Sequence, residues 1–134
     1  MELTEKTIKE ELIYKGRVFN VYNNTVTLPD GREAPREFIE HNGGVCVLPV
    51  CDNGDVILVK QFRYGIRNTL IEIPAGKLEK GENHRECGLR ELKEEIGATP
   101  SEFVYLGECL PTTAYFSERI HMYLAKGLSF SEQH

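Results

Sequence analysis

The feature that most constrains this chain is a regularly spaced acidic stretch from Gly76 to Ala98, GKLEKGENHRECGLRELKEEIGA. If residues 82–96 are helical, at about 100° per residue, three aliphatic side chains form one stripe. They are Leu89, Leu92 and Ile96. Three acids then cluster on the opposite face, namely Glu91, Glu94 and Glu95. The stretch therefore predicts a helix with a core face and a carboxylate face.

The carboxylate face is locally unfavourable. The three acids lie in the last turn before Gly97, where the helix dipole and their mutual repulsion disfavour negative charge by about 1 kcal/mol. A solvated acidic surface is one interpretation. The other is a divalent cation, because carboxylates at positions i, i+3 and i+4 converge and Mg²⁺ prefers oxygen ligands.

The surrounding residues favour the cation. They fit the spacing G-x5-E-x7-R-E-U-x-E-E-x-G-U, where U is aliphatic, and Ala98 holds the last position with a smaller side chain. The matching residues are Gly76, Glu82, Arg90, Glu91, Leu92, Glu94, Glu95 and Gly97. This pattern resembles the signature of the Nudix hydrolases.

Three further segments resemble the ADP-ribose pyrophosphatase branch of that family: IEIPAGKLE before the helix, VKQFR upstream and LPTTAYFSE downstream. The resemblance runs from about Arg36 to Gly127. It implies an α/β fold, the Nudix α/β/α sandwich with a mixed sheet. Where the branch often has Ser-Pro-Gly, this chain has Leu110-Pro-Thr-Thr, so the loop that shapes the sugar pocket is expected to differ.

Composition bounds the class of protein. With 134 residues, 40% of them hydrophobic and 28% charged, the chain suits one compact domain with a small appendage. A net charge of −5 argues against a nucleic-acid-binding surface. There is no membrane-length apolar run and no signal-peptide core, so we expect a cytoplasmic protein without a membrane partner. The four cysteines lack C-x-x-C spacing and are given no chemistry.

The first forty residues predict three polar-rich strands in a small antiparallel sheet, which cannot bury much of a core. We expect a boundary near His41, with residues 1–41 as a dimerisation or swap unit and residues 42–134 as the Nudix domain. Members of the branch commonly dimerise by exchanging such a unit, so the resemblance implies a homodimer.

Within residues 42–134, Gly44–Val50 and Val56–Arg63 predict a buried hairpin, followed by a strand over 70–73. A turn is expected at Thr99-Pro-Ser, and strands over 103–110 and 119–125.

The resemblance also implies the site. Glu91 and Glu95 would be direct metal ligands, with Glu94 binding directly or through water and the Ala75 carbonyl as a further donor. The expected ion is Mg²⁺, with Mn²⁺ as an alternative. Glu82 and Arg90 would hold the ligating carboxylates in position rather than bind substrate.

Three other residues are candidates for substrate binding. Arg63 stands where the branch has an arginine that contacts the phosphates. The alternative interpretation is a surface charge at the end of a strand. Arg36 would reach a nucleotide in the partner subunit, and Glu118 would contact the adenosine end. For both residues the alternative interpretation is a solvated surface charge. His84, expected at the surface, and His41 and His121 receive no role.

The end of the chain bears on turnover. Relatives continue past a GLSFxEQH-like segment into an acidic loop with the candidate general base and a closing helix, whereas this chain stops at His134. The loop with the general base and the closing helix are therefore expected to be missing. Glu132 is the nearby carboxylate on the terminal segment, and a chain end supports a base poorly.

The sequence thus predicts Mg²⁺-dependent hydrolysis of ADP-ribose, or a related nucleoside diphosphate sugar, to AMP and ribose 5-phosphate. The alternatives are a nucleotide-binding module with little turnover and an interaction domain with a vestigial signature.

Overall fold

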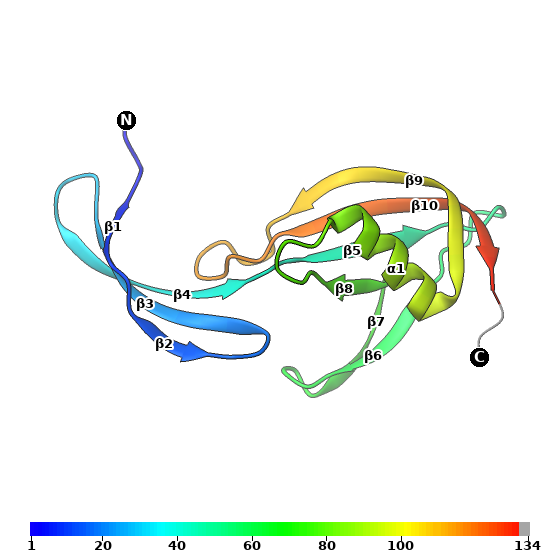
Figure 1. Ribbon diagram of the computed structural model, residues 1–134, viewed down its shortest axis with the longest axis horizontal. Helices are drawn as coiled ribbons and strands as arrows, with labels where there is room; N and C mark the ends of the chain where they lie inside the picture. The colour runs from blue at the N-terminus through cyan, green and yellow to red at the C-terminus, as the bar shows by residue number, and fades with distance from the viewer. Residues whose placement is uncertain (132–134) are drawn as a thin grey trace. The chain divides into compact units, whose positions relative to one another are not determined.

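The computed structural model describes residues 1–131, which form two compact units (Figure 1). The first contains Met1–Asn42 and Leu110–Glu118, and the second contains Gly43–Cys109 and the chain from Arg119 onward. Glu132 lies outside the described residues.

The first unit is an antiparallel sheet, as expected, but it has four strands rather than three because the first expected strand is divided in two. Its strands are β1 (Lys6–Lys9), β2 (Leu12–Lys15), β3 (Phe19–Thr27) and β4 (Glu33–His41). The central strand β3 pairs with β4 along one edge and with β1 and β2 in succession along the other. The segment Leu110–Glu118 joins this unit because the Ile39 amide donates to the Tyr115 carbonyl at 2.7 Å.

The second unit is built on a mixed sheet in the order β8-β5-β10-β9. Its strands are β5 (Gly44–Pro49), β8 (Ala75–Lys77), β9 (Ala98–Cys109) and β10 (Ile120–Phe130). β5 and β10 are parallel, and the other two pairs are antiparallel. The core consists of Val45, Val47, Cys87, Leu92, Ala98, Tyr123 and Ala125. The mixed sheet is therefore confirmed, whereas the turn expected at Thr99-Pro-Ser is wrong because these residues continue β9.

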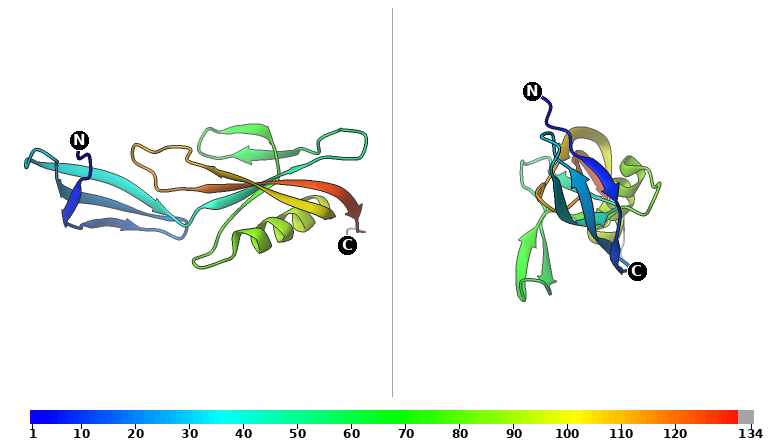
Figure 2. Two further views of the ribbon diagram at one scale, coloured as in Figure 1. Left: turned by 90° about the horizontal axis from the view of Figure 1, so that it is seen from above. Right: turned by 90° about the vertical axis from the view of Figure 1, so that its left-hand side faces the viewer.

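The helix α1 (His84–Ile96) lies on one face of this sheet (Figure 2). The Asn83 side chain caps its start by accepting from the Glu86 amide at 3.1 Å. Gly97 ends it in the left-handed region, with a φ of 70° that glycine adopts without strain. At 13 residues, α1 is the one helix in residues 1–131, and it is too short and too polar to cross a bilayer. The described residues thus provide one helical layer of the expected sandwich.

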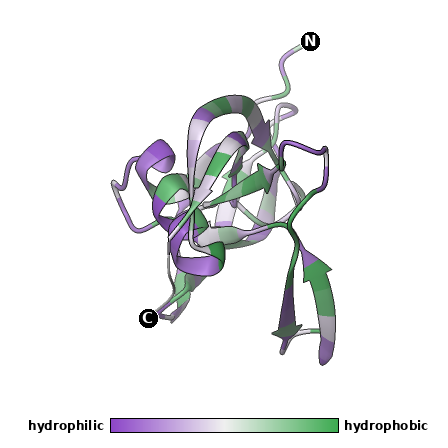
Figure 3. Cartoon of the chain, turned by 90° about the vertical axis from the view of Figure 1, so that its right-hand side faces the viewer, coloured by the Kyte–Doolittle hydropathy of each residue, from purple (hydrophilic) through white to green (hydrophobic). Residues whose placement is uncertain are grey.

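The hairpin expected between Gly44–Val50 and Val56–Arg63 forms only at its turn, where the Cys51 amide donates to the Asp55 carbonyl at 2.8 Å and Val50 bridges to Val56. The expected pairing beyond the turn is wrong, because β5 pairs with β8 and β10. The strand β6 (Val59–Arg63) instead pairs with β7 (Asn68–Glu72) in a separate two-stranded sheet. This β6–β7 hairpin exposes apolar side chains, including 62% of Phe62. Figure 3 colours part of the hairpin as hydrophobic.

Candidate functional site

Two of the three predicted carboxylates turn toward β8. A Cβ atom built on Gly76 would stand 2.2 Å from Cδ of Glu91, so only glycine lets the carboxylate lie against this strand. Glu91 and Glu95 are half-buried, whereas Glu94 is exposed. The carboxylate face expected opposite the core stripe is therefore divided into two sheltered acids and one solvated acid.

The pKa values of both sheltered acids are raised. Burial is the main cause that raises the pKa of Glu91, and Glu94 and Glu82 raise it further while Arg90 opposes them. Burial also raises the pKa of Glu95, as do Glu91 and Glu72, against a hydrogen bond from the backbone of Ala75 and the charge of Arg63. Both carboxylates would be stabilised by positive charge placed between or beside them.

One oxygen at this face is buried without a polar partner among the described residues. Oε2 of Glu95 is buried and accepts no hydrogen bond from any residue between 1 and 131. Such an orphaned carboxylate oxygen is costly to bury and is a suitable donor for a hard cation. Glu91 and Glu95 therefore fit the divalent metal that the signature implies.

The fit is partial. Within residues 1–131, no three His, Cys, Asp or Glu side chains are already grouped so that they could hold a metal ion. Mg²⁺ is commonly bound through one or two carboxylates together with water and phosphate oxygens, so two sheltered acids are chemically sufficient as the protein's share. Ala75 pairs with Cys46 beside this face, and its carbonyl stays a predicted donor.

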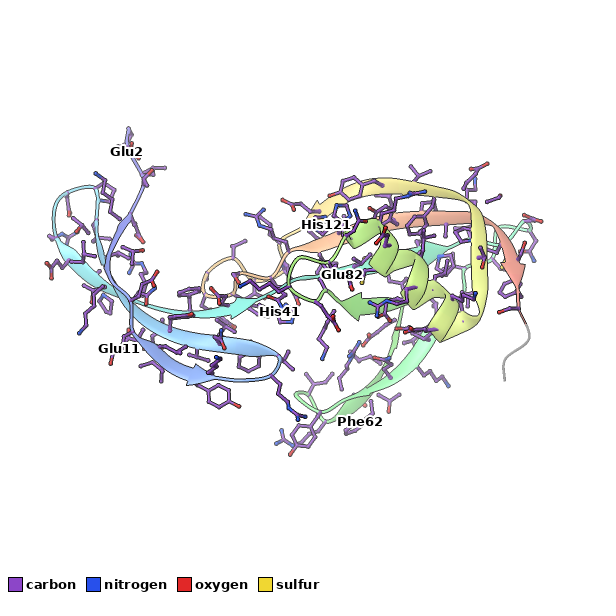
Figure 4. The ribbon with its side chains drawn as sticks, viewed as in Figure 1. Glu2, Glu11, His41, Phe62, Glu82 and His121 are labelled. Atoms are coloured by element: carbon purple, nitrogen blue, oxygen red, sulfur yellow. The ribbon has the colours of Figure 1, made fainter. Side chains whose placement is uncertain are left out.

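Arg90 connects the start of the signature to its carboxylates. Its Nη2 atom donates to both oxygens of Glu82, at 3.0 and 3.2 Å, and lies 3.6 Å from Oε1 of Glu91. Glu82 precedes α1 (Figure 4), so this guanidinium holds the entry loop against the first turns of the helix. The buried thiol of Cys87 also accepts from Arg90 at 3.5 Å, and burial is the main cause that raises its pKa to about 11.

Arg63, the predicted phosphate ligand, is paired within the β6–β7 hairpin. Its Nε donates to Oε2 of Glu72 at 2.8 Å, and its Nη2 donates to the other carboxylate oxygen. Half of the Arg63 side chain is exposed, so the guanidinium remains open to an anion. Sequence reasoning gave Glu72 no role, although it lies in the IEIPAGKLE segment and interrupts an apolar run, because its contact with Arg63 depends on the pairing of the hairpin.

The other two substrate candidates belong to the first unit, and each has a partner there. Arg36 forms a two-point ion pair with Glu5, at 2.8 and 2.6 Å. Glu118 lies 3.4 Å from Nδ1 of His41. These contacts add a structural explanation for both residues, and their expected roles toward a nucleotide stay predictions.

His84 is not the plain surface residue that its position predicted. Its ring stacks on His121, with centroids 3.9 Å apart, and its Nδ1 lies 2.5 Å from the Tyr123 hydroxyl. Nδ1 of His121 in turn lies 3.0 Å from the Tyr105 hydroxyl. The cluster secures the start of α1 on β9 and β10, a long-range contact that the sequence pattern does not indicate.

Two family models match consecutive parts of the chain. A model described as "NUDIX domain" matches residues 40–131. A second, described as "Nucleoside diphosphate sugar hydrolase N-terminal domain", matches residues 5–39.

Individual relatives agree with these models. The chain is 44% identical to "ADP-ribose pyrophosphatase" of Bacillus subtilis over 98% of its own length and 71% of that protein. It is 41% identical to "Methanol dehydrogenase activator" of Bacillus methanolicus over 96% of its length and 69% of that protein. A crystal structure titled "ADP compounds hydrolase" superposes with a TM-score of 0.85, at 22% identity, covering all of this chain and 74% of the other. That structure shares the fold.

The raised pKa of Glu95 predicts how the substitution Glu95→Gln changes the stability of the metal-free protein. A carboxyl whose folded pKa lies above its ordinary value of 4.5 destabilises the fold at neutral pH, and this destabilisation disappears as pH falls to 4.5. Removing the charge should leave the variant at least as stable as the wild type at neutral pH. The variant should also gain less stability on acidification, measured by urea unfolding at several pH values.

The same variant should lose the response to metal. At a Mg²⁺ concentration of 100 times the Kd, the wild type should gain about 2.7 kcal/mol of unfolding free energy, and Glu95→Gln should lose most of this gain. Glu102→Gln, an exposed acid on β9, is the matched control and should respond like the wild type. Full metal stabilisation of Glu95→Gln would show that this face is not the metal site.

Proposed function

Because this chain belongs to the Nudix hydrolase family, we propose that it hydrolyses the pyrophosphate of ADP-ribose, or of a closely related nucleoside diphosphate sugar, in a Mg²⁺-dependent reaction. The products would be AMP and ribose 5-phosphate. Nudix hydrolases in general use divalent metal ions, and Mn²⁺ is the alternative to Mg²⁺. The observation that carries the proposal is the orphaned oxygen of Glu95 beside Glu91, within the family's signature.

Each signature residue has a defined part in this proposal. Glu91 and Glu95 would hold the cation, with Glu94 turning toward it directly or through water and the Ala75 carbonyl as a further donor. When bound, the metal would supply Lewis-acid stabilisation of the pyrophosphate and a more acidic water. Arg90 holds Glu82 and approaches Glu91, which fixes one ligand before the cation arrives.

Arg63 would bind the phosphates. Its guanidinium is half exposed, is always charged and presents a planar set of donors that matches phosphate oxygens. Glu118 would contact the adenosine end, and Arg36 would reach the nucleotide of a partner subunit. These two assignments rest on the family resemblance.

A product assay tests the proposal. The protein would be incubated with ADP-ribose and Mg²⁺, and AMP and ribose 5-phosphate would be measured by chromatography, with chelator as the blank. Metal-dependent turnover at about 1 s⁻¹ or faster is the expected result. Tight binding of ADP-ribose without product would instead identify a binding module, and absence of both would exclude this function.

The role of Arg63 predicts the effect of Arg63→Ala. Loss of two charged hydrogen bonds should weaken ADP-ribose binding roughly 10- to 100-fold while leaving Mg²⁺ affinity nearly unchanged. Calorimetry with Ca²⁺ in place of Mg²⁺ measures nucleotide affinity without turnover. Arg67→Ala is the control, since Arg67 lies in the same hairpin over the Tyr64 ring. An equal loss of metal and nucleotide affinity in Arg63→Ala would make Arg63 a structural residue.

We also propose a homodimer in which residues 1–41 of each chain pack on the other as an exchanged unit. The support is exposed apolar surface on this small sheet. The exposed side chains are Ile8, Leu12, Ile13, Tyr14, Val18 and Phe19.

Two variants test the dimer. Ile13→Glu places a charge in this apolar surface and should raise the dimer dissociation constant about tenfold or more in light scattering, whereas Lys15→Glu on the same strand should not. Deleting residues 1–41 should give aggregate or a destabilised monomer with impaired nucleotide binding, because it also removes the hydrogen bonds between Ile39 and the segment 110–118. A stable micromolar monomer of the intact chain would disprove the dimer.

A further inference from the structure

The ion pair between Arg63 and Glu72 spans the whole β6–β7 hairpin. The pairing register places Arg63 opposite Asn68, beside the turn, and Glu72 opposite Val59, at the other end. Four residues of antiparallel strand cover about 13 Å. The two side chains nevertheless form a two-point contact, so both extend along the hairpin toward each other.

The register also places both residues on one face. Side chains two residues apart share a face of a strand, so Arg63 lies on the face of Gln61 and Val59. Glu72 is directly opposite Val59 and shares that face. The Arg63 side chain therefore runs past the Gln61–Leu70 pair, away from the turn and toward the end of the hairpin that leads into Ala75.

That direction brings the guanidinium toward the carboxylate face. Glu72 is the last residue of β7, and the chain reaches Ala75, the first residue of β8, three positions later. β8 also contains Gly76, against which the Glu91 carboxylate lies, so this end of the hairpin leads directly to the sheltered acids. The exposed fraction of Arg63, 47%, is twice that of Glu72, 22%, so the guanidinium is the more accessible half of the pair.

We propose that Glu72 is a positioning residue for substrate binding, which draws the Arg63 guanidinium from the hairpin turn to the edge of the carboxylate face. The proposal rests on the proposed function in taking a nucleoside diphosphate as the ligand of Arg63. Two of the five guanidinium N–H groups point at Glu72, and the remaining three are available to phosphate oxygens. Pre-orientation lowers the rotamer entropy that a flexible arginine loses on binding.

Glu72 could also have the opposite effect on nucleotide binding, by competing with phosphate for Arg63, and the two effects can be distinguished. If Glu72 only competed with phosphate for Arg63, removing its charge would free the guanidinium and tighten nucleotide binding. If Glu72 positions Arg63, removing its charge lets the side chain return to the solvent around the turn and weakens binding. The sign of the change for Glu72→Gln separates the two.

The test is a double-mutant cycle with Glu72→Gln, Arg63→Ala and the double variant, using ADP-ribose with Ca²⁺ in calorimetry. Glu72→Gln should weaken ADP-ribose binding roughly tenfold and change the affinity for Mg²⁺ alone by less than about twofold. The double variant should bind no more weakly than Arg63→Ala, because Glu72 acts through Arg63. Additive losses, unchanged binding or tighter binding in Glu72→Gln would overturn the proposal.

A matched control uses the same substitution at another exposed ion pair of the second unit. Glu108 accepts from Arg119 at 2.7 Å, and Glu108→Gln should leave ADP-ribose affinity unchanged. A comparable loss in Glu108→Gln would show that any lost surface carboxylate has this effect, and would overturn the specific role of Glu72.

A measurement without ligand tests the positioning role of Glu72 independently of the proposed function. The Nε–H group of Arg63 should give a slowly exchanging nitrogen–proton NMR signal in the wild type, identified by its absence in Arg63→Ala. This signal should disappear in Glu72→Gln, and its persistence there would overturn the positioning role even if the protein bound no nucleotide. Failure of the wild type to bind ADP-ribose would contradict the proposed function alone.

Discussion

The close approach of α1 to β8 at Gly76 is the contact on which the candidate site depends. Because Gly76 has no side chain, Glu91 lies against the strand, and the next turn brings Glu95 beside Ala75. The same approach brings Leu92 into the core cluster that contains Val45 and Val47. Packing of the core and sheltering of the two acids are therefore one structural event, in which apolar burial offsets the cost of desolvating carboxylates.

Local patterns in the sequence were sufficient for the helix and for most strands. The expected helix over 82–96 differs from α1 by two residues at its start, where the Asn83 cap sets the boundary. The partners of β5 could not be predicted, because an apolar run indicates burial without saying which strands cover its edges. The turn expected at Thr99 failed for a related reason, since pairing with Ser129 extends β9 through it.

The candidate site was predictable in its residue types and less so in their environments. The signature spacing identified Glu91, Glu94 and Glu95 as a group, yet only the packing against Gly76 distinguishes the sheltered pair from the solvated third acid. The stacked rings of His84 and His121 and the ion pair of Arg63 with Glu72 depend on neighbours distant in sequence or at the far end of a hairpin. No local pattern marks such contacts.

The parallel pairing of β5 with β10 has a consequence for how the chain folds. Gly44 meets Ile120, so the centre of the second unit closes only when two distant segments meet, and this closure loses much chain entropy before contacts compensate for it. The β6–β7 hairpin and α1 are local and can form earlier. During synthesis on a ribosome, β5 would therefore emerge long before its partner, with one edge unpaired and open to association with other nascent chains.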